Sequence, residues 1–206
     1  ISKKRDDLRT NQMRNFTPMV RSNSDYSCVS LSFTVMRCVV QRKSTESTLN
    51  AENLFAELKA KFDERGDEKF RPTVDTYATL FEALLYSPLR AEELLEDMLK
   101  DGLRPNTYIF SNVMIAWSKS LDPCKAAKTL RLLQKMRELN IDPALTTFNT
   151  AIGSCARTVG KDEQQTAALK IAFAIFRAME RYQVEPNHVT FSILFECIGR
   201  LLPPGD

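Results

Sequence analysis

The chain has 206 residues, of which 43% are hydrophobic and 27% charged, and it carries a net charge of +3. This composition is typical of a globular chain with a buried core and excludes a disordered one. Nine of the 29 basic and three of the 26 acidic residues lie in 1–43, which leaves 20 basic against 23 acidic residues in the remainder. A uniformly basic nucleic-acid-binding protein is therefore excluded. No apolar stretch reaches the roughly 20 residues that a membrane-spanning helix requires.

Residues 1–24 form a basic segment that is rich in serine, threonine and asparagine and has no regular hydrophobic period. We predict that this segment is poorly structured and is either the remnant of an organelle transit peptide or a linker. Asp6 and Asp7 argue against the transit peptide, because such peptides contain few acidic residues. The chain begins at Ile1 rather than at methionine, so we expect a fragment or a processed product.

The residue types that commonly perform catalysis or bind metals are sparse. The five cysteines never form a C-x-x-C pair, and His188 is the single histidine, so the usual zinc-site spacings are excluded. Cys38, Cys155 and Cys197 fall on apolar faces of predicted helices and are expected to be buried free thiols, which suits a reducing compartment. His188 follows a Pro-Asn pair and is predicted to be a solvated residue at a helix start.

The sequence also has no glycine-rich phosphate loop, and no nucleophile can be grouped with a base and an orienting residue. We therefore predict a protein that is not an enzyme. The same observations predict that it uses no cofactor, no metal and no small-molecule substrate.

A self-similar pattern recurs along the chain from residue 70 onward. Four prolines are each followed, five residues later, by an aromatic residue, and each is preceded, two residues earlier, by an apolar one. A methionine stands seven residues before each of the last three prolines. The prolines are Pro72, Pro105, Pro143 and Pro186, the aromatic residues are Tyr77, Phe110, Phe148 and Phe191, and the methionines are Met98, Met136 and Met179. The constant gaps indicate a repeated structural unit.

Each unit has the pattern of two helices. Apolar residues stand three, four and seven positions after each aromatic residue, and the same spacing runs backwards from each methionine, with Thr129 as the one polar member. This spacing places the side chains on one stripe of an α-helix, and we expect the stripes to form the core. One helix pair cannot bury both of its apolar faces, whereas stacked pairs can. We predict an all-α fold, an α-solenoid of about four antiparallel helix pairs followed by a lone final helix.

The predicted repeat array covers residues 25–206. Its units are expected at 28–73, 74–106, 107–144 and 145–187, with a partial unit at 188–206. The first unit is the weakest match to the pattern. The preferred register of its first helix places on one face Leu31, Thr34, Val35 and Cys38.

These motifs resemble those of the pentatricopeptide repeat family. The family's first-helix pattern V-T-Y-N-x-L-I is matched by residues 74–81, 145–152 and 188–194, and its second-helix pattern A-x-x-L-F-x-x-M by residues 91–98. The unit closes on an apolar residue, a charged residue and Pro-Asn or Pro-Asp, as in residues 103–106. The match is good over 74–201 and weaker over 28–73. The sequence lacks the H-x-E and C-x-x-C motifs of the deaminase-like C-terminal domain found in some members.

The resemblance implies a protein that binds single-stranded RNA at about one nucleotide per repeat. It also implies a mitochondrial or chloroplast location and a role in RNA processing, stability or translation. In the family, one base is contacted by the residue after the first-helix aromatic, here termed the reading slot, and by the residue after the closing proline. These pairs are Ala78 with Asn106, Ser111 with Ala144, Asn149 with Asn187, Ser192 alone in the partial unit, and Ser32 with Thr73 in the weakest unit.

Two of the clear pairs depart from the family's pattern. Alanine has no side-chain donor or acceptor, so Ala78 and Ala144 leave Asn149 with Asn187 as the full polar pair among them. An amide offers both a donor and an acceptor, and the resemblance implies cytosine or uracil at that position. We expect weak RNA binding with little sequence selectivity. The alternative is a helical scaffold that binds a protein partner, as tetratricopeptide repeats do.

A row of cations follows the reading slots. The residue nine positions after the aromatic is Lys119, Arg157 or Arg200 in successive units, and Tyr86 in the unit before them. This place lies about two helical turns beyond the reading slot on the same face. The spacing therefore predicts phosphate contacts by the three cations. The alternative is that they are residues near helix C-termini, where the macrodipole favours positive charge.

Overall fold

The computed structural model describes residues 45–202, with side chains from residue 48 onward. This part of the chain contains eight α-helices, one short 3₁₀ helix and no strand. The elements are α3 (Thr45–Arg65), η1 (Glu68–Phe70), α4 (Val74–Ala83), α5 (Pro88–Lys100), α6 (Thr107–Lys119), α7 (Lys125–Glu138), α8 (Leu145–Ala156), α9 (Asp162–Arg181) and α10 (His188–Leu201). The predicted all-α solenoid is confirmed. The predictions for residues 1–24, for Ser32 and for the first helix at Leu31–Cys38 fall outside the described residues.

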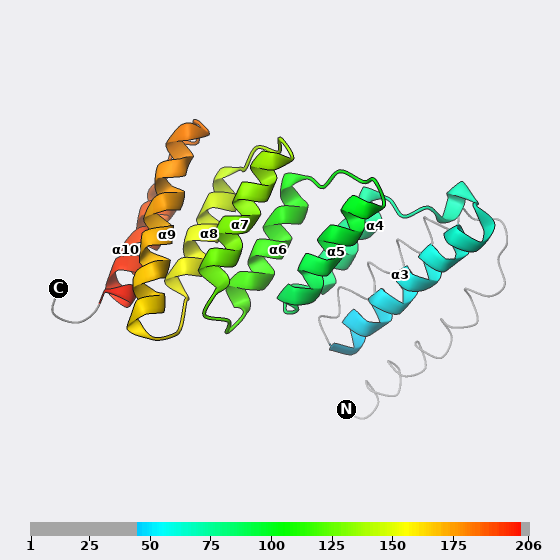
Figure 1. Cartoon of the computed structure of the whole chain (residues 1–206), viewed down its shortest axis with the longest axis horizontal. Helices are drawn as coiled ribbons and strands as arrows, with labels where there is room; N and C mark the ends of the chain where they lie inside the picture. The colour runs from blue at the N-terminus through cyan, green and yellow to red at the C-terminus, as the bar shows by residue number, and fades with distance from the viewer. Residues whose placement is uncertain (1–44, 203–206) are drawn as a thin grey trace, which may run out of the picture.

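The helices alternate between two layers that run along the long axis of the molecule (Figure 1). α4, α6, α8 and α10 form one layer, in which each helix packs on the next, and α7 packs on α9 in the other layer. We call them the first-helix layer and the second-helix layer. None of the helices between residues 45 and 202 is both long and apolar enough to cross a membrane.

Local hydrogen bonds explain why each first helix begins just after a proline. The residue after the proline caps the helix: Thr73, Asn106 and Asn187 each accept a hydrogen bond from the backbone N–H three residues later. Such caps contribute about 1 kcal/mol each to helix stability. Ala144 occupies the same place before α8 without a side-chain bond.

The constant gap from methionine to proline has an equally local cause. Four residues after the methionine, Gly102, Asn140 and Gln183 each adopt a left-handed backbone with φ between 53° and 73°. The next residue is apolar, and its N–H donates to the methionine carbonyl, as in Leu103 N to Met98 O at 3.1 Å. This is the Schellman motif, which ends a helix and reverses the chain within a fixed number of residues.

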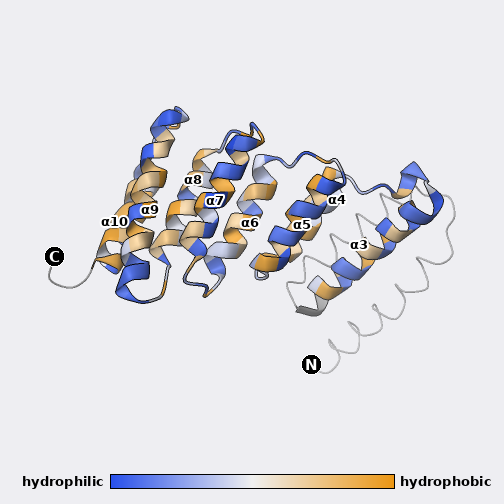
Figure 2. Ribbon diagram, viewed as in Figure 1, coloured by the Kyte–Doolittle hydropathy of each residue, from blue (hydrophilic) through white to orange (hydrophobic). Residues whose placement is uncertain are grey.

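The core is built from the predicted stripes. Tyr77, Phe110 and Phe148 are fully buried, as are the three methionines of the second helices. Figure 2 shows hydrophilic residues on the outward side of α5, α7 and α9, while α6, α8 and α10 are largely apolar. Cys155 and Cys197 are buried free thiols as predicted. Burial raises the pKa of Cys155 to about 12 and that of Cys197 to about 11.

The prediction that every stripe is buried is wrong for α10. Phe191 is 46% exposed and Phe195 is 69% exposed, although their counterparts in α6 and α8 are inaccessible to solvent. The reason is that within residues 45–202 no later helix covers the outer face of α10. His188, the first residue of α10, is exposed as predicted.

Candidate nucleic-acid interface

The first-helix layer and the adjoining turns enclose a hollow of about 1000 Å³, here called the groove. It is lined by residues of α6, α8 and α10, by the turns after α4, after α6 and before α10, and by Lys125 at the start of α7. Four of the residues singled out from the sequence line it: Lys119, Asn149, Arg157 and Asn187. The other predicted site residues, which do not line it, are Ala78, Asn106, Ser111, Ala144, Ser192 and Arg200.

Asn149 and Asn187 meet through Thr190. The hydroxyl of Thr190 donates to Asn149 Oδ1 at 2.8 Å, and the backbone N–H of Thr190 donates to Asn187 Oδ1 at 3.1 Å. Both amide oxygens are therefore engaged inside the protein. Neither Nδ2 group donates to any other group among residues 48–202, so the pair offers donors to the groove.

The same arrangement occurs one unit earlier in a weaker form. Ser111 Oγ lies 3.2 Å from Thr147 Oγ1, and Thr147 holds the place in α8 that Thr190 holds in α10. In the unit before that, the reading slot is Ala78 and the corresponding residue of the next first helix is Ile109, which is buried. A polar reading slot thus has a threonine opposite it in the next unit, and the apolar slot has an isoleucine.

Sequence analysis did not identify Thr147 and Thr190. A signal was available, because the residue immediately before the aromatic is threonine after a polar slot and isoleucine after Ala78. Its meaning depends on which residues of neighbouring units meet, and that pairing appears once the units are stacked.

The remaining predicted reading residues do not line the groove. Asn106 is exposed, and its Oδ1 accepts from Ile109 N at 3.0 Å as a helix cap. Ala144 is exposed at the start of α8, and Ser192 is exposed on α10. Ala78 is half-buried against the core.

Of the three cations predicted to contact phosphate, two line the groove, and their binding of phosphate stays a prediction. Lys119 Nζ lies 4.3 Å from the ring centroid of Tyr86, and Arg157 Nη1 donates to Ser118 Oγ at 3.5 Å; both cations line the groove. Arg200 instead forms an ion pair with Glu196 one helical turn away, at 3.1 Å. The row of three therefore becomes a pair of cations in the groove and a paired cation outside it.

A further cation, Lys125, lines the groove and was not identified from the sequence. It is the first residue of α7 and is only 2% exposed. Burial, followed by the nearby positive charge of Arg157, lowers the pKa of its ammonium group, and Asp122 opposes the shift. Within residues 48–202, Lys119, Lys125 and Arg157 make no ion pair with a carboxylate.

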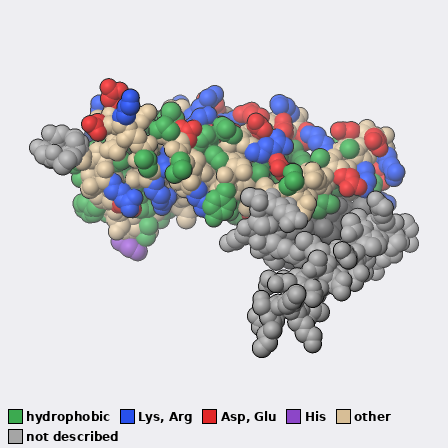
Figure 3. All heavy atoms as spheres, turned by 90° about the horizontal axis from the view of Figure 1, so that it is seen from below, with side chains coloured by type: hydrophobic (Ala, Val, Ile, Leu, Met, Phe, Trp, Pro, Cys, Tyr) green, Lys and Arg blue, Asp and Glu red, His purple; other side chains and the backbone are tan. Residues whose placement is uncertain are grey.

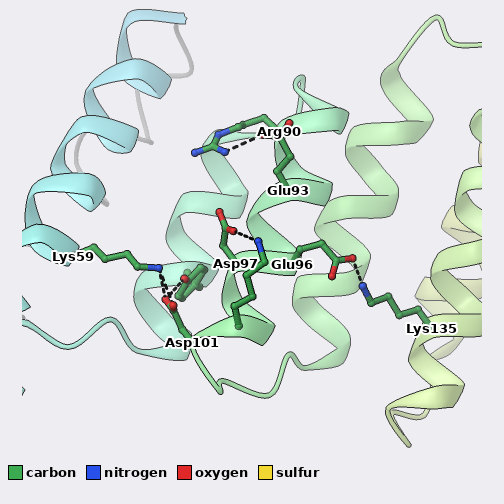
Figure 4. Close-up of polar contacts among 9 residues, drawn as sticks. Lys59, Arg90, Glu93, Glu96, Asp97, Asp101 and Lys135 are labelled. Carbon is green, nitrogen blue, oxygen red and sulfur yellow. Dashed lines mark hydrogen bonds and ion pairs between the residues drawn. The ribbon is translucent and has the colours of Figure 1, made fainter. Parts of the chain in front are cut away.

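On the opposite side of the molecule, several cations of the second-helix layer form ion pairs, although others, such as Arg131 and Arg177, form none with any described residue. There, Lys59 pairs with Asp101, Arg90 with Glu93, and Lys135 with Glu96 (Figure 4). Figure 3 shows basic side chains along the lower edge of the C-terminal half of the molecule, and acidic and basic side chains intermixed toward the N-terminal half. The groove thus holds three cations, Lys119, Lys125 and Arg157, that form no ion pair with a carboxylate among the described residues, which is an arrangement suited to an anion.

A family model described as a pentatricopeptide repeat domain matches residues 93–158 and 164–200, which is half of the chain. The chain belongs to the pentatricopeptide repeat family. Three Arabidopsis thaliana proteins that are named pentatricopeptide repeat-containing are similar to it, and two of them are named chloroplastic. One of the chloroplastic proteins is 24% identical over 76% of this chain and 31% of its own length. A second relative is 30% identical over 60% of this chain and 21% of its own length.

The pentatricopeptide repeat chain thus spans about a third or less of these relatives. A solved structure of the pentatricopeptide repeat domain of Arabidopsis thaliana protein-only RNase P 1, in complex with tRNA, matches its fold. The TM-score is 0.51 and the identity 16%, over 80% of this chain and 81% of that one. Within the described part of this pentatricopeptide array, no group of three or more His, Cys, Asp or Glu residues is placed to hold a metal ion.

Proposed function

We propose that this pentatricopeptide repeat array binds single-stranded RNA along the groove of its first-helix layer. The observation that carries the proposal is the groove itself, which places two amide donors, Asn149 and Asn187, beside three cations that lack carboxylate partners. Single strands are bound by such a combination of a basic groove and groups that meet base edges. The tRNA bound to the similar repeat domain of the RNase P protein supports RNA as the class of ligand.

The hydrogen bonds of Thr190 determine which groups of Asn149 and Asn187 remain available to contact a base. Because both amide oxygens are engaged, the pair presents N–H donors, and a matching base must present acceptors. Cytosine presents neighbouring O2 and N3 acceptors on its pairing edge, and uracil presents two carbonyl oxygens. Adenine presents one acceptor beside a donor amine. The donor pair therefore favours a pyrimidine, in agreement with the family's pairing pattern.

The array is further proposed to act in organelle RNA metabolism, in a chloroplast or a mitochondrion. Two of the similar proteins are named chloroplastic, which supports localisation in an organelle. The groove contains a single full polar reading pair, so the described part of the chain is expected to contribute affinity and one selected position. Selection of more RNA positions would require further repeat units with full polar reading pairs.

The first prediction tests the proposed function through Asn149. Selection from randomised single-stranded RNA should give a pyrimidine preference at one position in the wild type. In Asn149→Ser the preference should move toward adenine, because serine with asparagine is the family's adenine-favouring pair. Serine can also bond to Thr190, as Ser111 does to Thr147.

Asn53→Ser is the matched control, because Asn53 is exposed on α3, far from the groove in sequence and in the fold. It should leave the selected sequence unchanged. Identical base profiles for wild type and Asn149→Ser would show that this pair does not read RNA. A wild type that binds no RNA but retains a protein partner would favour the scaffold function instead.

A further inference from the structure

Lys125 is a buried cation that the repeat pattern does not require. It stands eleven residues before the second-helix methionine, and the residues at the same place in the neighbouring units are Ser87, just before α5, and Ala168 of α9. Ala168 is 1% exposed, so an uncharged residue fills this place in the next unit. The fold therefore does not need the charge of Lys125, and a buried ammonium group without a carboxylate destabilises the folded state.

The Lys125 ammonium group has one partner in the protein. Its Nζ donates to the carbonyl oxygen of Ser120 at 3.0 Å, in the turn between α6 and α7. An ammonium group has three N–H donors, so two remain for another acceptor. Lys125 lines the groove, which gives that acceptor a way in from solvent.

Arg157, at the C-terminal end of α8, is folded back toward the same place. Its guanidinium lies over Gly153, where a Cβ atom would be 3.6 Å from Nη2, and its Nη1 donates to Ser118 Oγ at 3.5 Å. The Ser118 hydroxyl donates in turn to the carbonyl oxygen of Ile115 at 3.1 Å. Ser118 is therefore a positioning residue, because its own hydrogen is engaged and its lone pair orients Arg157.

Two positive charges that repel each other are thus held together by the fold. The charge of Arg157 makes the protonated form of Lys125 less favourable, and Asp122 opposes this effect without forming an ion pair with Lys125. Lys119 adds a third charge to the same hollow. An anion bound between Lys125 and Arg157 would relieve the repulsion and supply the missing acceptors.

We propose that Lys125, which is buried, and Arg157, which is exposed, form a phosphate-binding site in the lining of the groove. The site takes one phosphodiester of a single strand whose base lies at Asn149, and in this form it rests on the proposed function. The Arg157 guanidinium lies over Gly153, which is four residues after Asn149 on α8, or about 6 Å along the helix axis, so one nucleotide can reach both Asn149 and the guanidinium. The same chemistry would accept a terminal phosphate, and the experiment separates the two sources.

The test combines variants of the whole chain with RNA whose phosphates are replaced one at a time by neutral methylphosphonates. Lys125→Ala introduces the residue that α9 carries at this place. Arg131→Ala is the control, because it removes one charge from the exposed side of the same helix. Wild type should lose about tenfold in affinity at one neutral linkage, the size expected for a charge-assisted hydrogen bond.

Lys125→Ala should bind unmodified RNA about tenfold more weakly than the wild type does. Its affinity should not fall further when that linkage is replaced by a methylphosphonate. Arg131→Ala should respond to it as the wild type does. Equal sensitivity of Lys125→Ala and wild type at every linkage would overturn the site. If the loss instead depends on a 5′-phosphate, compared with a 5′-hydroxyl, the source is a terminal phosphate.

A second measurement separates failure of this site from failure of RNA binding. Inorganic phosphate is titrated into the protein, and side-chain NMR signals of Lys125 and Arg157 are followed. Shifts that saturate in the wild type and in Arg131→Ala, and whose Arg157 component is lost in Lys125→Ala, establish the anion site even if no RNA binds. Absence of any shift, together with an unchanged methylphosphonate profile, rules the site out.

Discussion

Two junctions between successive helix pairs differ in how they are held together. Between the α6–α7 pair and the α8–α9 pair, both layers are in contact, and Thr129 Oγ1 lies 2.8 Å from Ser154 Oγ in the interior. Between the α4–α5 pair and the α6–α7 pair, α4 packs on α6, but the backbones of α5 and α7 do not approach each other. That gap is bridged by the ion pair Lys128–Glu92 and by the ion pair Lys135–Glu96 (Figure 4).

The difference shows which part of the array can hold a precise site. Hydrophobic packing fixes the spacing of α6 and α8, and the groove with Asn149 and Arg157 lies where both layers are packed. Surface ion pairs contribute only about 0–1 kcal/mol each and are weakened by salt. We therefore expect the α6–α10 part to act as one rigid unit, and the junction before it to be the more easily deformed.

The largest effect is expected from breaking the packed junction itself. Met136 of α7 is fully buried, so Met136→Asp places an unpaired carboxylate in the core and should destabilise the fold by several kcal/mol, roughly 3–5. Chemical denaturation followed by circular dichroism should show loss of the α6–α10 part. Gln134→Asp, at an exposed place on the same helix, should change stability by less than about 0.5 kcal/mol. Similar curves for both variants would contradict the buried role of Met136.

A smaller loss of stability is expected at Asp101, which ties α3 and α4 to the end of α5. Its carboxylate accepts from Lys59 Nζ at 2.8 Å and from the buried Tyr77 hydroxyl at 2.6 Å. Asp101→Asn should lower the free energy of unfolding by about 1–3 kcal/mol at neutral pH. Asp97→Asn, which breaks only the exposed pair with Lys100, should cost less than about 1 kcal/mol.

The Asp101 effect should depend on pH in a defined direction. Burial alone would raise the pKa of this carboxyl, but the hydrogen bonds from Lys59 and Tyr77 outweigh it and hold the pKa below its ordinary value. The stabilisation is complete above the ordinary carboxyl pKa and is lost as the pH falls through the lowered one. The difference between wild type and Asp101→Asn should therefore shrink in acid. A difference that grows in acid would contradict this assignment.

The next prediction concerns the rigid α6–α10 part, where Thr190 of α10 orients Asn149 of α8. Thr190→Val removes the hydroxyl, frees the amide to turn its oxygen toward the groove, and should reduce pyrimidine selectivity by about fivefold, or roughly 1 kcal/mol. Thr190→Ser should restore it. Because Thr190 also belongs to the helix cap with Asn187, the decisive readout is the ratio of affinities for pyrimidine and purine. A merely structural role would lower both affinities equally and leave that ratio unchanged.

The smallest effect on stability is expected at the bridged junction. Glu92→Gln with Glu96→Gln removes both ion pairs and should cost no more than about 1 kcal/mol in total. Small-angle scattering should nevertheless report a broader distribution of overall lengths at low salt. High salt should remove the difference between the variant and wild type. A loss of several kcal/mol would mean that these pairs, rather than the first-helix layer, hold the junction together.

The sequence by itself determined the elements that depend on near neighbours. The caps at Asn106 and Asn187, the left-handed residues at Gly102 and Asn140, and the buried methionines all follow from hydrogen bonds and spacings within a few residues. Helix starts, helix ends and the apolar stripes are local features, so they could be predicted. The family and the fold followed from their repetition.

The contacts between residues of different repeat units became known only from the tertiary structure. In the folded chain, Thr190 donates to the oxygen of Asn149, and the buried Lys125 lines the groove. Arg200 pairs with Glu196, and Phe191 remains half exposed. These outcomes depend on the separation and rotation between stacked helix pairs. Packing of whole faces sets those quantities, and proline spacings of 33, 38 and 43 residues do not encode them.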